Sequence, residues 1–272
     1  MIVLLRVFVC VAAMAAAFGA ARAEGKICTS ILEGGEDCAP LPRVTAKGDL
    51  RVEVITRKRS VTYPLSAAKD LDEDLTSSCP GGKCGCDEHV QYFDFKGPVP
   101  GFRQVNAFEM RAAAGAKCSI ENSNVAREAM HFAVSAHFIS TATYQLEYCH
   151  GCGGSCHGTT VLATYDAQSG KALHLRDILK AGAGDALASQ LADDFVQSSV
   201  DAPERAWTRA QLVKELSARP LLDEGFYVEN GRVYANLDSF ATSCAAGSFF
   251  PVPVRADMID PAVAAAIKNS AN

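Results

Sequence analysis

The stretch that decides the fold is residues 159–175, which read TTVLATYDAQSGKALHL. Residues 159–165 are rich in β-branched and aromatic side chains, which predicts a strand. The tripeptide Gln168-Ser169-Gly170 is typical of a turn, and residues 171–175 are suited to a returning strand. This stretch therefore predicts an antiparallel hairpin in the C-terminal half of the chain.

Helical patterns follow the hairpin. Residues 177–180 predict a short helix that stops before Gly182. Thr208 and Gln211 have the spacing of a capping box, which predicts the start of another helix. Between these two, an amphipathic helix is predicted from Asp185 onward, because apolar residues recur there at helical spacing: Leu187, Leu191, Phe195 and Val196.

Further strand signals lie on both sides of these helices. Asn230-Gly231, between two apolar runs, is the strongest hairpin signal in the chain. Residues 129–148 are aromatic and β-branched, which favours two adjacent strands, and an alternating pattern begins at Asp49. Residues 76–101 contain closely spaced Cys, Gly and Pro, and we expect an irregular, bridged surface loop there. The predicted fold class is α+β, a largely antiparallel, disulfide-stapled sheet with a few packed helices.

The N-terminus has the pattern of a signal peptide. An apolar, alanine-rich run follows Arg6, and Ala21-Arg22-Ala23 resembles a cleavage signal, so we expect residues 1–23 to be removed. Cleavage would leave 24 of the 26 basic residues against 31 acidic ones and would move the formal net charge from −5 to −7. We therefore expect a periplasmic or secreted protein without membrane insertion after cleavage. Its acidic charge excludes nucleic-acid binding by bulk charge and favours basic partners.

Cysteine is the second compositional signal. An even number of cysteines in an exported chain is typical of a disulfide framework. Ten remain after the expected cleavage, and their connectivity stays open in the sequence: Cys28, Cys38, Cys79, Cys84, Cys86, Cys118, Cys149, Cys152, Cys156 and Cys244.

The order of motifs in the C-terminal half resembles the extracytoplasmic RsiV/PdaC-type domain. That domain is shared by a lysozyme-sensing anti-sigma factor and a peptidoglycan deacetylase. The matching features are an aromatic strand at 144–148, a glycine-rich loop at 153–158, a turn ending in Gly170-Lys171, and a helix start at 175–179. Residues 61–64 are similar to the entry of the family's preceding small domain, and 226–237 with 246–253 resemble its closing strands.

The resemblance covers roughly Leu50 to Ile267, and it does not extend to the membrane, sigma-binding or deacetylase parts of those relatives. The cysteines of the 149–156 loop and the Cys79–Gly101 stretch also depart from the family pattern. The expected organisation is a signal peptide (1–23), a Cys-bridged segment and linker (24–48), a small subdomain with a Cys-rich loop (49–140), and an RsiV/PdaC-like domain (141–272).

The most chemically loaded stretch is the Cys/His loop at residues 149–158. A loop stapled between two strands is pre-organised for binding, and its candidate binding residues are His150, Gly153, Gly154, Ser155, His157 and Gly158. The alternative interpretation is a metal site, because thiolates and imidazoles are ligands for zinc or copper. Its ligands would be Cys149, His150, Cys152, Cys156 and His157.

We found no catalytic constellation in the sequence, so we predict no catalytic residue, no enzyme activity and no cofactor. The leading hypothesis is a non-enzymatic binding module, and the resemblance implies that its partner is lysozyme or another basic protein of the cell envelope. A periplasmic metal-binding protein is the alternative hypothesis. A hydrolase acting on peptidoglycan is the third.

Overall fold

The computed structural model describes residues 26–28, 38–40, 44–45, 49–67, 79–120, 122–149, 156–198, 208–218, 220–236 and 251–269. At several ends of these ranges, including residues 149 and 156–158, the backbone alone is described. Among the described residues, no helix is long and apolar enough to cross a membrane.

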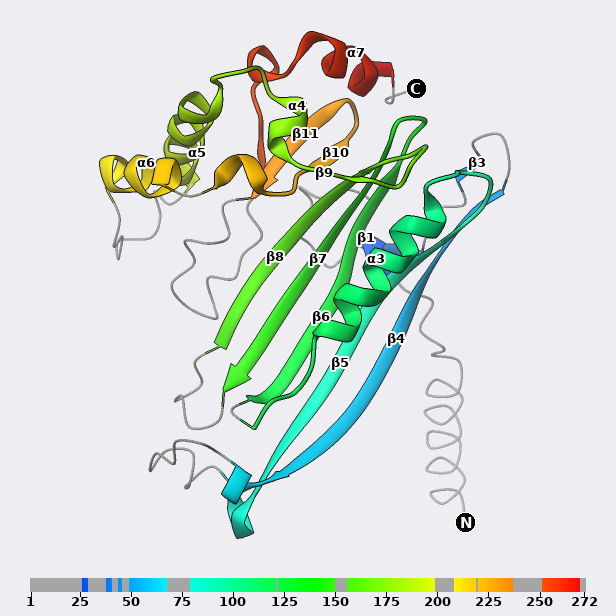
Figure 1. The fold of residues 1–272 in the computed structure, drawn as a ribbon, viewed down its shortest axis with the longest axis vertical. Helices are drawn as coiled ribbons and strands as arrows, with labels where there is room; N and C mark the ends of the chain where they lie inside the picture. The colour runs from blue at the N-terminus through cyan, green and yellow to red at the C-terminus, as the bar shows by residue number, and fades with distance from the viewer. Residues whose placement is uncertain are drawn as a thin grey trace, which may run out of the picture.

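A seven-stranded sheet is the centre of the described structure, with its strands in the order of the sequence (Figure 1). Every neighbouring pair is antiparallel except β5 and β6, which are parallel. The predicted α+β class with a largely antiparallel sheet is confirmed. The strands are β3 (Val44–Thr45), β4 (Asp49–Pro64), β5 (Lys83–Lys96), β6 (Asn122–Val134), β7 (Phe138–Cys149), β8 (Cys156–Asp166) and β9 (Ala172–Leu173).

Helix α3 (Phe102–Gly115) makes the crossover that the parallel pair β5–β6 requires. Phe102, Val105 and Ala113 are buried at helical spacing and face the sheet. The Phe102 ring stacks on Phe95 at 5.3 Å between centroids. One hydrophobic core therefore lies between α3 and the sheet, and it extends across the strands to Tyr165 of β8.

The prediction of an irregular surface loop at residues 76–101 is wrong for most of that stretch. Residues 83–96 form β5, whose buried residues alternate from Cys84 to Val90 and change phase before Phe93 and Phe95. Glycine and proline surround this strand on both sides, which made the whole stretch resemble a loop. A short bridged segment does precede β5, because Cys79 and Cys84 form a disulfide.

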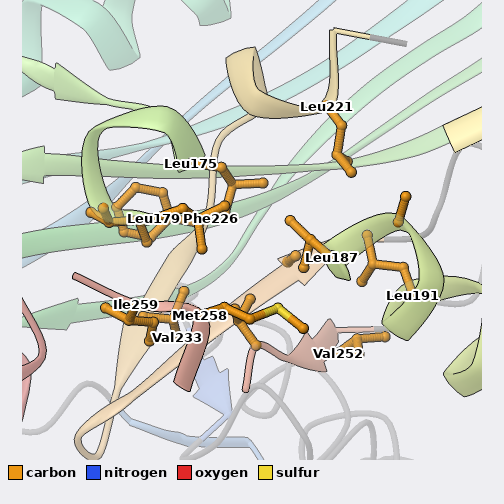
Figure 2. Packing of buried hydrophobic residues seen from close by; sticks show 14 of the residues in the cluster. Leu175, Leu179, Leu187, Leu191, Leu221, Phe226, Val233, Val252, Met258 and Ile259 are labelled. Carbon is orange, nitrogen blue, oxygen red and sulfur yellow. The ribbon is translucent and has the colours of Figure 1, made fainter. Parts of the chain in front are cut away.

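A second hydrophobic core lies in the helical lobe, the part of the chain that follows β9 (Figure 1, Figure 2). Leu187 and Leu191 of α5 pack there with Leu175, Phe226 and Met258. Its helices are α4 (Leu175–Ile178), α5 (Gly184–Ser198), α6 (Arg209–Ala218) and α7 (Pro261–Asn269), and its strands are β10 (Tyr227–Glu229), β11 (Arg232–Asn236) and β12 (Pro251–Pro253).

Short elements complete the description. Two strands, β1 (Lys26–Cys28) and β2 (Cys38–Pro40), pair with each other antiparallel. The 3-10 turns are η1 (Leu65–Ala67), η2 (Pro80–Gly82), η3 (Leu221–Asp223) and η6 (Ala256–Met258). The predicted subdomain boundary between residues 140 and 141 falls inside β7, and the main sheet continues across it.

Several local predictions are confirmed. Residues 122–149 form the adjacent strands β6 and β7, and the hairpin of β8 and β9 has its turn at Gly170 (φ 69°). Asn230 and Gly231, both with positive φ, join β10 to β11. The capping box of α6 is present, because Thr208 N donates to Gln211 Oε1 (2.8 Å) and Gln211 N donates to Thr208 Oγ1 (3.3 Å). The helix predicted at 177–180 begins and ends two residues earlier, as α4.

Two hydroxyl side chains join the helical lobe to the main sheet. Thr164 Oγ1 donates to the Phe226 carbonyl (2.6 Å), and Ser140 Oγ accepts from Val228 N (3.0 Å). Ser140 and Thr164 are 2.8 Å apart and both are buried. Because the hydroxyl proton of Thr164 is donated to the Phe226 carbonyl, the Ser140 hydroxyl must be the donor in its hydrogen bond with Thr164 Oγ1. Strand β10 is thereby held against β7 and β8.

Gly225 allows this close approach, because a Cβ built on it would lie 2.0 Å from the backbone oxygen of Leu162. We expect Gly225→Ala to lower the free energy of unfolding by about 2 kcal/mol, since the overlap with the backbone of β8 pushes the segment before β10 away from that strand. Urea unfolding followed by circular dichroism measures this change. Gly182→Ala is not a suitable control because of its positive φ, whereas Gly85→Ala meets nothing within 4 Å and should change stability little. Equal losses in the two variants would contradict the prediction.

Candidate functional site: the cysteine-rich end of the sheet

One end of the main sheet gathers most of the cysteines that the structure describes. We call it the cysteine-rich end: the beginning of β5, the segment after α3, the beginning of β6, the end of β7 and the beginning of β8 (Figure 1). The strand register brings these parts together. Asp87 pairs with Asn124, Asn122 pairs with Cys149, and Tyr148 pairs with Cys156. The helical lobe lies at the opposite end of the sheet (Figure 1).

Two disulfides staple this end. Cys79, which precedes β5, is bonded to Cys84 at the beginning of that strand, and Cys86 of β5 is bonded to Cys118, which follows α3. All four cysteines are buried. The sequence predicted these residues as disulfide candidates, and the structure supplies the pairing that the sequence left open.

A buried carboxylate holds the segment that follows α3. Glu88, 5% exposed, accepts a hydrogen bond from Cys118 N (3.1 Å) and lies 3.7 Å from the Arg57 guanidinium. Arg57 also donates to the carbonyls of Ala113 (3.2 Å) and Ala116 (3.1 Å). A cation at a helix C-terminus is favourable because the last carbonyls carry partial negative charge. The end of α3 is therefore fixed to β4 and β5 by a charge network as well as by a disulfide.

Strand β7, which leads into the predicted binding loop, is joined to β6 by polar side-chain contacts. Asn122 Nδ2 donates to Glu147 Oε2 (3.3 Å), and Ser123 Oγ donates to the Tyr148 carbonyl (3.3 Å). These contacts fix the end of β7 just before the loop. The loop starts on β7 and ends on β8, and these strands are hydrogen-bonded neighbours, as the sequence predicted.

The predicted binding residues lie only in part within the described chain. His150, Gly153, Gly154 and Ser155 fall outside it, as do Cys152 and Cys244. His157 and Gly158 are described by their backbone alone, which pairs with Glu147 and Leu146 of β7. Their role in binding stays a prediction.

The remaining cysteines are placed by backbone pairing only. Cys28 and Cys38 are directly opposite each other in the β1–β2 pair, in agreement with a local bridge predicted between them. Cys149 and Cys156 lie on adjacent strands. Within the described ranges no three His, Cys, Asp or Glu side chains are grouped so as to hold a metal ion. The alternative set Cys149, His150, Cys152, Cys156 and His157 lies at or beyond their limits, and the metal hypothesis stays a prediction.

A buried ion pair between α3 and the sheet was not predicted. Arg127 Nη2 and Glu109 Oε2 are 2.9 Å apart, and each residue is 2% exposed. Thr141 Oγ1 donates to Glu109 Oε1 (2.9 Å), and Arg127 Nη1 donates to the Gln91 carbonyl (2.6 Å). Burial raises the pKa of the nearby Tyr165, and the Glu109 carboxylate raises it further. The sequence contains one signal for this buried ion pair: Glu109 is four residues from both Val105 and Ala113, on the apolar face of the helix.

This ion pair fits a structural role better than a chemical one. Both carboxylate oxygens of Glu109 and both Nη atoms of Arg127 have hydrogen-bond partners, and both side chains are closed to solvent, although Arg127 Nε has no partner among the described residues. A catalytic acid or base has to reach a substrate. We therefore keep the cysteine-rich end as the candidate site.

Comparison with known proteins gives similarities in fold. No protein-family model matches the sequence, and no curated protein matches it. A DUF3298 family protein from Pseudomonas aeruginosa PAO1 is similar with a TM-score of 0.44 and 11% identity, over 76% of this chain and 95% of that one. A DUF3298 family member from Bacteroides fragilis NCTC 9343 is similar with a TM-score of 0.49 and 11% identity, over 80% of this chain and 97% of that one. These structural neighbours belong to the RsiV/PdaC-type domain family that the sequence resembles.

Proposed function

We propose that this chain is an exported, non-enzymatic binding module, and that the cysteine-rich end recognises a basic protein of the cell envelope. Lysozyme is the partner to test first. The lysozyme part of the proposal comes from the sequence resemblance to a family with a lysozyme-sensing member. The chain's acidic charge, −5 overall, is suited to a basic partner.

The observation that carries the proposal is the stapled framework beneath the Cys/His loop. Two disulfides, the Arg57–Glu88 contacts and the Asn122–Glu147 hydrogen bond all lie at the end of the sheet where the loop begins. A rigid base lowers the ordering entropy that a loop loses when it binds. Such a framework supports a recognition loop better than it supports catalysis, which requires a reacting group in contact with substrate.

The test is a titration of lysozyme into the purified, oxidised full chain, followed by calorimetry. We expect saturable binding that weakens as salt is added, because exposed opposite charges are screened. His157→Ala and His150→Ala should each weaken binding about tenfold if these side chains contact the partner. His137→Ala is the matched control, since this exposed histidine lies at the opposite end of β7 and should leave the affinity unchanged.

Four outcomes would count against the proposal. Undetectable binding would remove lysozyme as the partner, and an equal loss in the His137 control would remove the loop as the contact. Thiols in the 149–156 loop that react with an alkylating reagent in the unfolded, non-reduced chain would favour the metal-binding alternative. Release of fragments from cell-wall sacculi would favour the hydrolase.

A further inference from the structure

The outer edge of β4 is long and open. β4 pairs with β5 from Arg51 to Pro64, but on its other side β3 pairs only with Asp49 and Leu50. Over the rest of β4, no described strand lies against this edge (Figure 1). An edge of this kind presents a row of backbone donors and acceptors to which another strand can pair.

Three consecutive cations stand in the middle of this edge: Arg57, Lys58 and Arg59. Arg57 is committed to the carbonyls at the end of α3 and to Glu88. Lys58 and Arg59 are exposed, and neither forms an ion pair with any residue in the described part of the chain. Because successive side chains of a strand point to opposite faces, the edge presents a free cation on each face.

The acids nearest to these cations are already occupied. Glu88 is the residue opposite Arg59 in β5, but it is buried and accepts from Cys118 N. Asp87 accepts a hydrogen bond from Ser60 Oγ (2.6 Å). Glu53, an acid on β4 itself, is paired with Arg51 and Lys96. The positive charge of Lys58 and Arg59 is therefore directed outward in a chain whose formal net charge is −5.

This charge selects among the strands that could pair with β4. A second copy of the chain, paired antiparallel about Lys58, would place Arg57 and Arg59 of the two copies opposite each other. Like charges directly opposite in a sheet are destabilising, whereas each opposite-charge pair contributes roughly 0.2–1 kcal/mol. The edge thus disfavours self-association and favours an acidic strand.

We propose that the outer edge of β4 binds an extended acidic segment of another protein as an additional strand, with carboxylates placed opposite Lys58 and Arg59. This edge adjoins the cysteine-rich end at Arg57, but the proposal does not rest on the binding of a basic partner at that end. The backbone pairing supplies affinity, and the two exposed cations supply the choice of partner.

The probe is a fluorescein-labelled peptide, Thr-Val-Thr-Glu-Glu-Glu-Thr-Val-Thr, titrated with the full chain and followed by fluorescence anisotropy. We expect saturable binding below about 1 mM protein. The same peptide with every second amide N-methylated keeps its charge but loses the donors needed for pairing, and it should not bind. Replacing Glu by Gln in the peptide should weaken binding about tenfold, because the charge pairs with Lys58 and Arg59 are lost.

Protein variants test the position of the site. Lys58→Glu/Arg59→Glu should weaken peptide binding by about tenfold or more. The control Lys171→Glu/Lys214→Glu makes the same change in net charge at exposed lysines of the β9 hairpin and α6, and should leave binding unchanged. Far-UV circular dichroism confirms that each variant is folded.

Each of the other results overturns the proposal. Absence of binding excludes an acidic strand at this edge. Equal binding of the N-methylated peptide means attraction by charge without strand pairing. Equal weakening by the control variant means bulk electrostatics. Sedimentation of the free protein as a dimer that Lys58→Glu/Arg59→Glu dissociates would assign the edge to a second copy.

Discussion

Glu109→Ala is expected to lower the free energy of unfolding by about 3–5 kcal/mol, because it leaves the Arg127 guanidinium buried without its counter-charge. Arg127 is 2% exposed, and its remaining described partner is the Gln91 carbonyl. The change also removes the acceptor of the Thr141 hydroxyl. One carboxylate thus joins α3 to β6 and β7, and its loss should loosen the helix from the sheet. Urea unfolding of the oxidised chain measures the effect.

The double variant Glu109→Leu/Arg127→Met is the control for this explanation. Replacing both charges by apolar groups of similar size removes the unpaired charge, and buried ion pairs replaced in this way are often neutral. We expect the double variant to lose less than half of what Glu109→Ala loses. A loss in the double variant equal to the sum of the two single losses would mean that the residues do not act as a pair.

The parts of the fold that were predicted from sequence are those with strong local signals. Asn230-Gly231 specifies its turn through two residues that tolerate positive φ. The Thr208–Gln211 box specifies a helix start through its own hydrogen bonds. The strands β6, β7 and β8 are rich in residues that suit a half-buried sheet. In each case the information lies within a few neighbouring residues.

The parts that were not predicted depend on distant partners. Helix α3 carries Glu109 on its buried face, which is acceptable only because Arg127 lies opposite in β6. Strand β5 is positioned by backbone pairing with β4 on one side and with the parallel strand β6 on the other. The Cys86–Cys118 pairing depends on the crossover through α3, which the sequence did not indicate. The candidate loop was recognised from its composition, but the framework beneath it required the structure.

Loss of the Cys86–Cys118 bridge is the second change with a large expected effect. The cross-link spans 32 positions, and the chain-entropy relation for a loop of that length predicts a loss of roughly 3–4 kcal/mol. We expect this loss in Cys86→Ala/Cys118→Ala, a variant without a free thiol at either position. The native segment keeps other contacts, since Tyr63 Oη donates to the Cys118 carbonyl (2.8 Å) and Glu88 binds Cys118 N. The folded spectrum should therefore be unchanged while the unfolding midpoint in urea falls.

The matched comparison is Cys79→Ala/Cys84→Ala, which also removes two buried half-cystines. The bridge lost in this variant closes a much shorter loop, with a sequence separation of 5. The same relation predicts a loss of only about 2 kcal/mol for the shorter loop. If the bridges act by restricting the unfolded chain, the longer one must contribute more, although the side-chain volume removed is the same. A larger loss for the shorter bridge would contradict this. It would mean that Cys79–Cys84 stabilises the folded cysteine-rich end directly, and the loop-binding experiments would then have to include that variant.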